Sequence, residues 1–436
     1  MKISFILNGN KVECEIENNE RLLHTLRERF SIKSVKEGCG IGECGTCTVL
    51  IDNEPHYSCL TLSSKVNGRD VKTVEFLNKK DTLHPLQEAF IKEGAVQCGY
   101  CTPGMLMSAY SLLLKEKNPG IDKIKNAISG NLCRCTGYWQ IVQAVQSVEG
   151  YDLWDNTQQV KMEKKQNGKR KEDILKLISQ NKNIKIIAGG TDILVKERKE
   201  GKTYNFIELS DLNELNIIKE ENGKITIGAI VTHAHINKNE IINKKAQSLA
   251  IACGMVGSPQ IRNMGTIGGN IINASPAADS IPPLLIHDAI CVLESIYKKK
   301  EIPLVDFIVS PYKTSIESDE LLTYIRINSL EGYTEGYEKV AKRSSLAIAR
   351  MSVAWAIKEK DDIFEDVRIS IGSCTPMPFR PEDAENFIKG KKKVDIIIKE
   401  TVSMILKGIV EKSGMRPSYR YKLPVLEGLL TKILRG

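Results

Sequence analysis

The chain has 436 residues, with 62 Lys and Arg against 54 Asp and Glu, which gives a formal net charge of +8. At about 100–200 residues per domain, this length allows three or four domains. No stretch approaches the roughly 18–20 uninterrupted apolar residues that a membrane span needs. Much of the basic excess lies in residues 161–172, which are typical of a solvated linker, so we expect neither a membrane nor a nucleic-acid partner.

The N-terminal segment MKISFILNGNKVECEIEN alternates apolar and polar residues on both sides of the turn NGN. It therefore predicts a β-hairpin and not a signal peptide, and we expect the protein to be cytoplasmic. Twelve cysteines in a reducing compartment favour metal or redox chemistry over disulfides. Eight of them form two tight groups, and the other four are expected to be small apolar core residues: Cys14, Cys253, Cys291 and Cys374.

The pattern along the chain predicts an α+β protein of several domains. After the hairpin, residues 19–30 (NERLLHTLRERF) indicate a short helix and residues 47–53 (CTVLIDN) a strand. Helices are expected at 101–117, with Thr102 as N-cap and Pro103 in the first position, and at 136–148. Apolar strands interrupted by glycines are expected at 184–190, 224–231 and 265–272, and a last α+β unit from about 336. The predicted domains are 1–76, 77–152, 173–335 and 336–436, with a linker at 153–172.

The stretch GCGIGECGTC, residues 38–47, fits two motifs. Its glycines match the dinucleotide pattern G-x-G-x-x-G, and its cysteines match the plant-type ferredoxin pattern C-x4-C-x2-C. A dinucleotide loop needs a strand before the glycines and a helix after them, whereas here SIKSVKE precedes and TCTVLI follows. The cysteines therefore predict a 2Fe–2S cluster, held by Cys39, Cys44, Cys47 and Cys59.

The second cysteine group is Cys98-x2-Cys101 with Cys133-x-Cys135. Spacing alone leaves two interpretations open, because four thiolates hold zinc as well as they hold a two-iron cluster.

The motifs CGxGxCGxCTV, QCGYCTPGM and NLCRCTGY together resemble the iron–sulfur part of the molybdenum hydroxylases, the xanthine dehydrogenase family. The resemblance implies two 2Fe–2S clusters, one in a β-grasp ferredoxin domain and one in a helical bundle. It assigns Cys98, Cys101, Cys133 and Cys135 to the second cluster. It also implies that Gln97 touches the pterin of a catalytic unit and that Cys135 lies close to it.

Two further segments are each ordinary glycine-rich loops when taken alone: IKIIAGGTDIL at 184–194 and GTIGGNIINASPAADSIPPLL at 265–285. Together they resemble the α+β, PCMH-like FAD-binding domain of the same family. The implied FAD contacts of the first are Lys185, Ile186, Ile187, Ala188, Gly189, Gly190, Thr191, Asp192 and Ile193, and those of the second are Thr266, Gly269, Asn270, Asn273 and Asp279.

The residues beyond these loops resemble the same flavoproteins less closely. SPYKTSIESDELLTYI resembles the family's Tyr-Arg-Lys-Thr segment but lacks the Arg between Tyr312 and Lys313. By resemblance Leu322 packs near the flavin ring, and Arg350, at the start of a C-terminal α+β flavoprotein domain, places a cation beside it. His233 and His235 have the spacing of two strand positions on one face and no third ligand nearby, so no metal site is expected there.

The resemblance covers nearly the whole chain but leaves no room for a molybdopterin-binding unit. It implies the electron-transfer subunit of a molybdopterin-dependent hydroxylase, which passes electrons from molybdenum through two 2Fe–2S clusters to FAD and then to NAD or another acceptor. The large molybdopterin subunit is expected to be a separate chain in a larger heteromer. The alternatives are a stand-alone iron–sulfur flavoprotein reductase and a zinc-stabilised scaffold.

Overall fold

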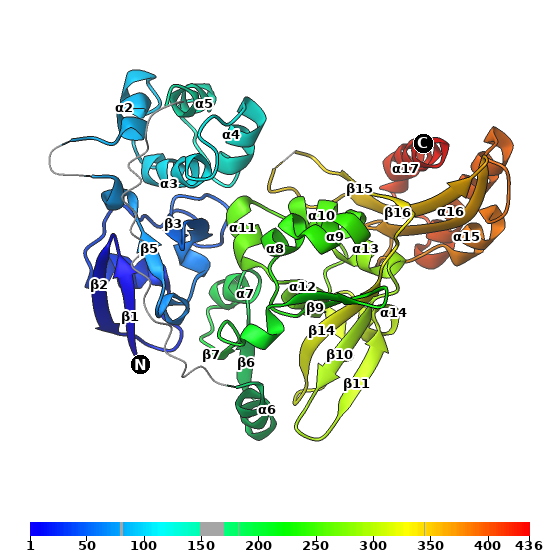
Figure 1. Ribbon diagram of the computed structural model, residues 1–436, viewed down its shortest axis with the longest axis horizontal. Helices are drawn as coiled ribbons and strands as arrows, with labels where there is room; N and C mark the ends of the chain where they lie inside the picture. The colour runs from blue at the N-terminus through cyan, green and yellow to red at the C-terminus, as the bar shows by residue number, and fades with distance from the viewer. Residues whose placement is uncertain (79–81, 149–169, 182, 344) are drawn as a thin grey trace. The chain divides into compact units, whose positions relative to one another are not determined.

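The computed structural model describes residues 1–78, 82–148, 170–181, 183–343 and 345–436 (Figure 1). Most of the predicted linker at 153–172 lies outside these residues. The chain forms two compact units, each composed of more than one stretch of sequence. The first unit consists of Met1–Lys169, Asn183–Asp211 and Gly257–Gly265, and the second of Arg170–Lys182, Leu212–Val256 and Thr266–Gly436.

The first part of the first unit is a five-stranded sheet with the order β2-β1-β5-β3-β4. Its strands are β1 (Lys2–Leu7), β2 (Asn10–Glu15), β3 (Thr48–Ile51), β4 (Glu54–Tyr57) and β5 (Asp70–Lys72). Its short helical turns are α1 (Leu22–His24), η1 (Thr25–Arg29), η2 (Ser58–Leu60), η3 (Ser63–Val66) and η4 (Val74–Leu77). Phe5 pairs with Val12 across β1 and β2, which confirms the predicted N-terminal hairpin.

The second part of the first unit is a group of four helices, α2 (Pro85–Lys92), α3 (Thr102–Leu113), α4 (Ile121–Ile128) and α5 (Trp139–Gln146). The two helices predicted here are present as α3 and α5. The prediction of Thr102 as N-cap is wrong, because α3 begins at Thr102 and is preceded by Cys101, whose side chain makes no capping hydrogen bond. Met105 and Ala109, one helical turn apart on α3, are buried in the core of this group.

The third part of the first unit joins the sheet domain through a shared apolar core. It contains β6 (Ile184–Ile187), α7 (Ile193–Glu200), β7 (Asn205–Glu208) and α11 (Pro259–Met264), with β6 parallel to β7. Ile187, Leu194 and Phe206 are buried together with Phe5 and Val49 of the five-stranded sheet. The loop that follows β6 therefore folds against that sheet, although about 110 residues separate the two in sequence.

The larger part of the second unit is a five-stranded antiparallel sheet, ordered β11-β10-β14-β9-β8, and the helices packed on it. Its strands are β8 (Ile218–Glu221), β9 (Lys224–Gly228), β10 (Ile290–Glu294), β11 (Lys299–Pro303) and β14 (Leu321–Asn328), beside the short pair β12 (Ile308–Ser310) and β13 (Lys313–Thr314). Its helices are α6 (Lys171–Gln180), η5 (Asn213–Leu215), α8 (His233–Lys238), α9 (Glu240–Lys245), α10 (Gln247–Gly254), α12 (Ile267–Asn273), α13 (Ile281–Ile286) and α14 (Leu304–Phe307).

The predicted strand at 265–272 is wrong, because this segment forms helix α12. The Thr266 hydroxyl accepts a hydrogen bond from the Gly269 N–H at 3.1 Å and so caps the helix. Ile267 and Ile271 are four residues apart and both are buried, which is a helical period hidden by the glycines between them. The strand interpretation of His233 and His235 is also wrong, since both lie in α8.

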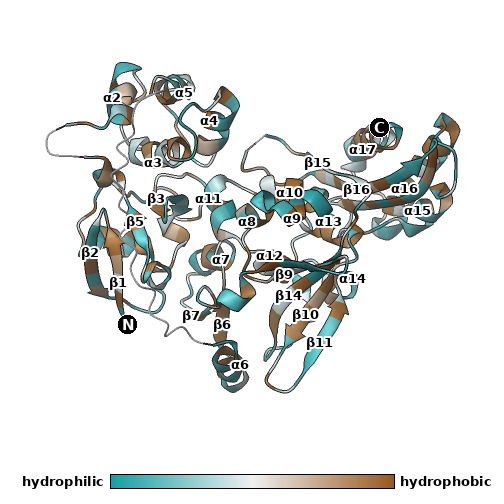
Figure 2. Cartoon of the chain, viewed as in Figure 1, coloured by the Kyte–Doolittle hydropathy of each residue, from teal (hydrophilic) through white to brown (hydrophobic). Residues whose placement is uncertain are grey.

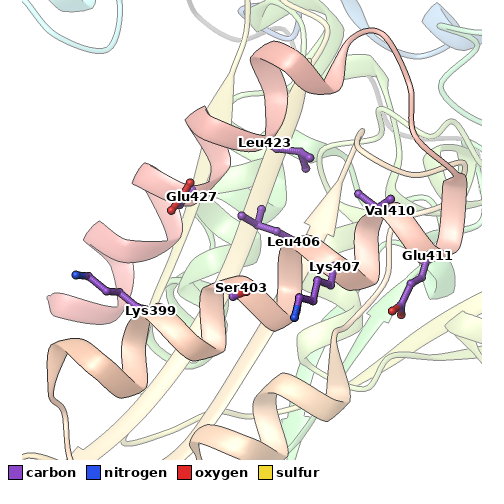
Figure 3. A pocket seen from close by; sticks show the side chains of 8 residues that line it. All are labelled: Lys399, Ser403, Leu406, Lys407, Val410, Glu411, Leu423 and Glu427. Carbon is purple, nitrogen blue, oxygen red and sulfur yellow. The ribbon is translucent and has the colours of Figure 1, made fainter.

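The C-terminal part of the second unit is a three-stranded sheet, β15 (Thr334–Val340), β16 (Met351–Lys360) and β17 (Ile363–Gly372). Helices α15 (Glu382–Ile388), α16 (Asp395–Ser413) and α17 (Tyr419–Arg435) complete this part. A groove runs between α16 and α17, with Leu406, Val410 and Leu423 along it and charged residues such as Glu427 beside them (Figure 3). None of the predicted site residues lines this groove.

Apolar residues gather on the inner strands and polar residues on the exposed ones. Figure 2 shows this contrast between β14, which is largely buried, and β11, which alternates between exposed and half-buried residues. Among the described residues, no helix has the length and apolar character needed to cross a bilayer.

The helices of the first unit approach its cysteine-bearing loop so closely that a glycine is required at Gly104. A Cβ atom at this position would lie 2.4 Å from the carbonyl oxygen of Gly45, where a backbone atom cannot move aside cheaply. Gly120, at the start of α4, has a negative φ and would place a Cβ with nothing within 4 Å. We therefore expect Gly104→Ala to destabilise the first unit by about 1–3 kcal/mol through overpacking.

In the matched variant Gly120→Ala, the poorer N-cap preference of Ala and the lower entropy of the unfolded chain oppose each other, so the free energy of unfolding is expected to change by less than about 0.5 kcal/mol. Calorimetric melting of the two variants and the parent chain measures the difference. Equal melting temperatures for all three proteins would show that the Gly104–Gly45 contact is not tight.

Candidate cofactor sites

The first cysteine group lies on the loop between η1 and β3, closed by Cys59 in η2. The backbone N–H groups of Ile41, Glu43 and Cys44 point at the sulfur of Cys39, at 3.5, 3.3 and 3.4 Å. This wrapping needs left-handed backbone, and Gly40, with φ +64°, supplies part of it. The loop therefore presents N–H donors to sulfur, which is a feature that tunes the reduction potential of iron–sulfur sites.

The four thiols of this group lie in two pairs, Cys39 with Cys44 and Cys47 with Cys59. The hydrogen bond from the Cys44 thiol lowers the pKa of Cys39 to about 4 and raises the pKa of Cys44. In the same way Cys59 lowers the pKa of Cys47 while its own pKa rises. Each pair thus has one sulfur that ionises readily. Two pairs match the ligands of two irons, each of which needs two protein thiolates.

The second cysteine group joins the N-terminal end of α3 to the loop before α5. The sulfurs of Cys98 and Cys135 lie 3.6 Å apart, and both residues are exposed. Burial and a hydrogen bond with Cys133 raise the pKa of Cys101 to about 12. The sulfur of Cys133 accepts a hydrogen bond from the Thr136 N–H at 3.5 Å. This group is again two pairs, Cys98 with Cys135 and Cys101 with Cys133.

The pairing of the thiols bears on the choice between zinc and a two-iron cluster. Within each group, thiol–thiol hydrogen bonds join the four sulfurs in two pairs. Paired thiols suit the two irons of a 2Fe–2S cluster, each of which takes two protein thiolates.

The two cysteine groups are joined by direct backbone contacts. The Leu132 N–H donates to the carbonyl oxygen of Cys44 at 2.9 Å, and the Asn131 amide donates to the carbonyl of Gly45, also at 2.9 Å. Gln260 of α11 is fully buried beneath this contact, and its amide donates to Asn131 Oδ1 at 3.0 Å. Since Leu132 precedes Cys133, one hydrogen bond connects a cysteine of the first group to the neighbour of a cysteine of the second.

The first predicted FAD segment forms the turn between β6 and α7 in the first unit. Gly189 and Gly190 are buried, and Gly190 has φ +89°. A Cβ on Gly189 would lie 2.3 Å from the carbonyl oxygen of Met264. No acceptor among the described residues takes the N–H of either glycine. Two buried donors without a partner suit an anion such as a diphosphate.

The other residues predicted in this segment differ in exposure. Ile187 is buried, Lys185 and Asp192 are exposed, and Ile186, Ala188, Thr191 and Ile193 are half-buried.

The second predicted FAD segment lies in the second unit, on α12 and the loop after it. The Thr266 hydroxyl is engaged in capping α12, Gly269 is exposed, and Asn270 accepts a hydrogen bond from the Ser280 hydroxyl at 2.7 Å. Asn273, at the end of the helix, is half-buried. The structure therefore places these four residues on one short helix.

Asp279 is buried, and both of its carboxylate oxygens have protein partners. The Tyr337 hydroxyl donates to Oδ1 and the Lys339 ammonium to Oδ2, each at 2.7 Å. Burial raises the pKa of Asp279, although Lys339 and Tyr337 oppose this effect. Sequence reasoning missed both partners; the only signal was that Tyr337 and Lys339 are two residues apart, on one face of a strand.

The remaining predicted residues are widely distributed. Leu322 is buried in the core of the five-stranded sheet. Arg350 is exposed and its guanidinium lies 5.9 Å from the centre of the Tyr421 ring. Gln97 is exposed beside Cys98. A further residue that the sequence did not single out, Lys65 of η3, donates to the carbonyls of Ala188 and Gly189 in the first FAD segment.

Comparison with family models divides the chain into four matched domains. A 2Fe-2S iron-sulfur cluster binding domain matches residues 5–72, and a [2Fe-2S] binding domain matches residues 73–146. An FAD binding domain in molybdopterin dehydrogenase matches residues 166–329, and a CO dehydrogenase flavoprotein C-terminal domain matches residues 337–436. With both cysteine groups inside the first two matches, the chain is an iron–sulfur flavoprotein with two 2Fe–2S domains and one FAD-binding domain.

Two relatives show the family. The chain is 33% identical over 266 residues to the glyceraldehyde dehydrogenase medium chain of Sulfolobus acidocaldarius, covering 61% of this chain and 94% of that one. It is 46% identical over 143 residues to the nicotinate dehydrogenase small FeS subunit of Eubacterium barkeri, covering 33% of this chain and 91% of that subunit. The chain belongs to the molybdenum hydroxylase family of oxidoreductases, that of xanthine dehydrogenase, as its iron–sulfur and FAD part.

Longer relatives match this chain over only part of their own length. The indole-3-acetaldehyde oxidase of Arabidopsis thaliana is 28% identical over 517 residues, which cover 100% of this chain but 39% of the plant protein. Among solved structures, carbon monoxide dehydrogenase from Hydrogenophaga pseudoflava matches with a TM-score of 0.55 and 22% identity, over 62% of this chain and 93% of that one. This structural likeness shows the fold alone. The predicted family, fold class and domain types are confirmed.

The separation of the eight cysteines into two groups predicts separable losses of iron. We expect the fully assembled chain to carry about four iron atoms, two for each cluster. Cys44→Ala removes a thiolate of the first group, and Cys101→Ala one of the second, so each is expected to retain about two iron atoms. Iron analysis and the electron paramagnetic resonance spectrum of the reduced protein measure this, because each variant should retain a different signal.

Cys14→Ala is the matched control, since Cys14 is half-buried on an edge strand and belongs to neither group. It should retain all the iron. Loss of both signals in either ligand variant would contradict the assignment of two independent clusters.

Proposed function

We propose that the chain is the electron-transfer subunit of a molybdopterin-dependent hydroxylase. Electrons from a molybdenum site in a separate partner chain would pass through two 2Fe–2S clusters to FAD, and then to NAD or another acceptor. The observation that carries this proposal is the backbone contact between the two cysteine groups, with Leu132 N–H donating to the Cys44 carbonyl at 2.9 Å. Such a contact provides a short path of bonds between the groups.

The proposal gives each set of residues a role in holding a cofactor. Cys39, Cys44, Cys47 and Cys59 would hold one cluster and Cys98, Cys101, Cys133 and Cys135 the other, with the segments at 185–193 and 266–279 holding FAD. When bound, the clusters accept single electrons and FAD exchanges one or two. The protein's own contribution is thiolates, N–H donors aimed at sulfur, and buried loops that exclude water. No side chain is required to act as a general base. We retain the predicted domain boundaries within this proposal.

Burial differs between the two groups in the direction that the proposal requires. Cys47 and Cys59 are buried, whereas Cys98 and Cys135 are exposed. Exposed apolar side chains adjoin the second group in sequence: Tyr100, Leu132 and Trp139 are 47%, 50% and 51% exposed. Large exposed apolar residues are typical of interaction surfaces. We infer that this second group, with Gln97 beside it, faces the molybdopterin-binding partner.

The relatives support a partner in a separate chain. Two of them are described as a medium chain and as a small FeS subunit, and this chain covers 94% and 91% of their lengths. The chain spans only 39% of the plant aldehyde oxidase and 35% of the aldehyde oxidase of Oryctolagus cuniculus. We place the complex in the reducing cytoplasm, where the twelve cysteines of the chain would remain thiols available to metal.

The partner surface can be tested by substitution. We expect Leu132→Glu and Trp139→Glu to leave the iron content unchanged and to weaken association with the molybdenum subunit at least about tenfold, because each places a charge in an apolar contact. The measurement is the amount of molybdenum and of second polypeptide that co-purifies with the tagged chain. Tyr297→Glu is the control, since Tyr297 is 81% exposed on the β10–β11 turn of the other unit.

If no molybdenum-containing polypeptide co-purifies with the parent chain when both clusters are intact, the stand-alone reductase is the better hypothesis. If Tyr297→Glu weakens association as much as Trp139→Glu does, the partner surface is assigned to the wrong face.

The acceptor side gives an independent prediction. The isolated chain, loaded with iron and FAD, should oxidise NADH in the presence of an artificial electron acceptor but hydroxylate no xanthine or aldehyde. Steady-state absorbance assays measure both reactions. If a fully flavinated preparation does not oxidise NADH, NAD is not the acceptor. If the chain alone hydroxylates xanthine or an aldehyde, no partner chain is required.

A further inference from the structure

The ammonium group of Lys65 lies directly behind the first FAD segment. Lys65 belongs to η3 of the ferredoxin-like sheet domain, six residues after the cluster ligand Cys59. Its Nζ donates to the carbonyl oxygen of Ala188, and to that of Gly189 at 3.0 Å. The carboxylate of Glu208, at the end of β7, acts on its charge, and the Ser64 hydroxyl donates to that carboxylate at 2.5 Å. The lysine thus reaches from one domain to the backbone of another.

The two carbonyls held by Lys65 belong to the peptides whose N–H groups are unused. In a trans peptide the C=O and N–H bonds point in opposite directions. The described residues contain no cis peptide, so the N–H groups of Gly189 and Gly190 point away from the ammonium. Those are the two buried N–H groups that no described residue accepts. A cation bound to the carbonyl end of a peptide polarises it and strengthens its N–H as a donor to an anion.

We propose that Lys65 is a positioning residue for the diphosphate of FAD. It fixes the Ala188 and Gly189 carbonyls on one side of the loop, so that the N–H groups of Gly189 and Gly190 face the anion on the other side. Its positive charge also offsets part of the negative charge brought by the ligand. This inference rests on the proposed function, in that residues 185–193 bind FAD, and adds that the ferredoxin-like domain completes the binding loop.

A second contact between the same two parts of the first unit does not reach the backbone of the loop, so it serves as a control. Arg198 on α7 pairs with Glu37 of the ferredoxin-like domain at 2.5 Å and is half exposed. It joins the same two parts of the first unit without touching Ala188 or Gly189. Arg198→Met therefore tests whether any loosening of this contact weakens FAD, or only the loss of Lys65.

The experiment titrates FAD into the full chain after flavin removal, under anaerobic conditions, with iron content measured on every sample. We expect Lys65→Met to raise the dissociation constant for FAD at least about tenfold, because the charge and both carbonyl contacts are lost. Lys65→Arg should restore affinity to within about threefold of the parent. At saturating FAD, the absorption spectrum and midpoint potential of the bound flavin should be unchanged, since the contact is to the diphosphate and not to the ring.

The outcomes separate this inference from the proposed function. If the parent chain binds no FAD, the proposed function fails. If the parent binds FAD and Lys65→Met binds it equally well, the role of Lys65 is wrong. Equal weakening in Lys65→Met, Lys65→Arg and Arg198→Met, or a flavin potential that shifts with the affinity, would show a general structural role instead. Lys65→Gln, which retains a neutral donor, replaces Lys65→Met if that variant fails to retain its iron.

Discussion

The backbone contact between the two cysteine loops is the constraint on which the first unit depends. Leu132 donates to the Cys44 carbonyl, and a Cβ atom on Gly45 would lie 2.3 Å from the carbonyl oxygen of Gly130. The two cysteine groups therefore meet through main chain, with the Asn131 side chain as a further link to Gly45. Electron transfer through protein depends steeply on separation, and this contact brings the segments that carry the two groups within backbone hydrogen-bonding distance.

The two cysteine groups differ in how deeply they are buried. The first group includes two buried cysteines inside the core of the sheet domain, and the second includes two exposed cysteines, one in the segment before α3 and one in the loop before α5. Burial and thiol–thiol hydrogen bonds both act on the pKa values, so that each pair contains one thiol that ionises readily. A site at the surface can meet a partner directly, whereas a more buried site is better shielded from solvent and from other molecules. The more buried group shares its core with Ile187, inside the first FAD segment, and with Leu194, just after it.

The sequence predicted the cysteine groups because their information is local. Three cysteines at C-x4-C-x2-C, with glycines between them, determine a loop almost independently of the rest of the chain. The same holds for the N-terminal hairpin and for α3. The segment at 265–272 was mispredicted because its helical signal, Ile267 and Ile271, is interrupted by two glycines, while the Thr266 cap depends on local geometry that periodicity does not reveal. The family resemblance supplied the FAD segments, since a Gly–Gly turn alone does not distinguish a nest from an ordinary turn.

The contacts that no local pattern could predict are those between distant segments of the first unit. Lys65 and Gly189 are 124 residues apart in sequence, and Tyr57 donates to the Gly130 carbonyl from 73 residues away. The first compact unit combines residues 1–169 with two later stretches, 183–211 and 257–265, so its boundaries differ from those of the domains along the sequence. Cys47, Cys59, Ile187 and Phe206 are buried in one core, so the packing around the first cysteine group also supports the strand before the Gly189–Gly190 turn. On the proposed assignment of these sites, cluster assembly and flavin binding would be linked through this core, because a ligand that binds only the folded core stabilises all of it.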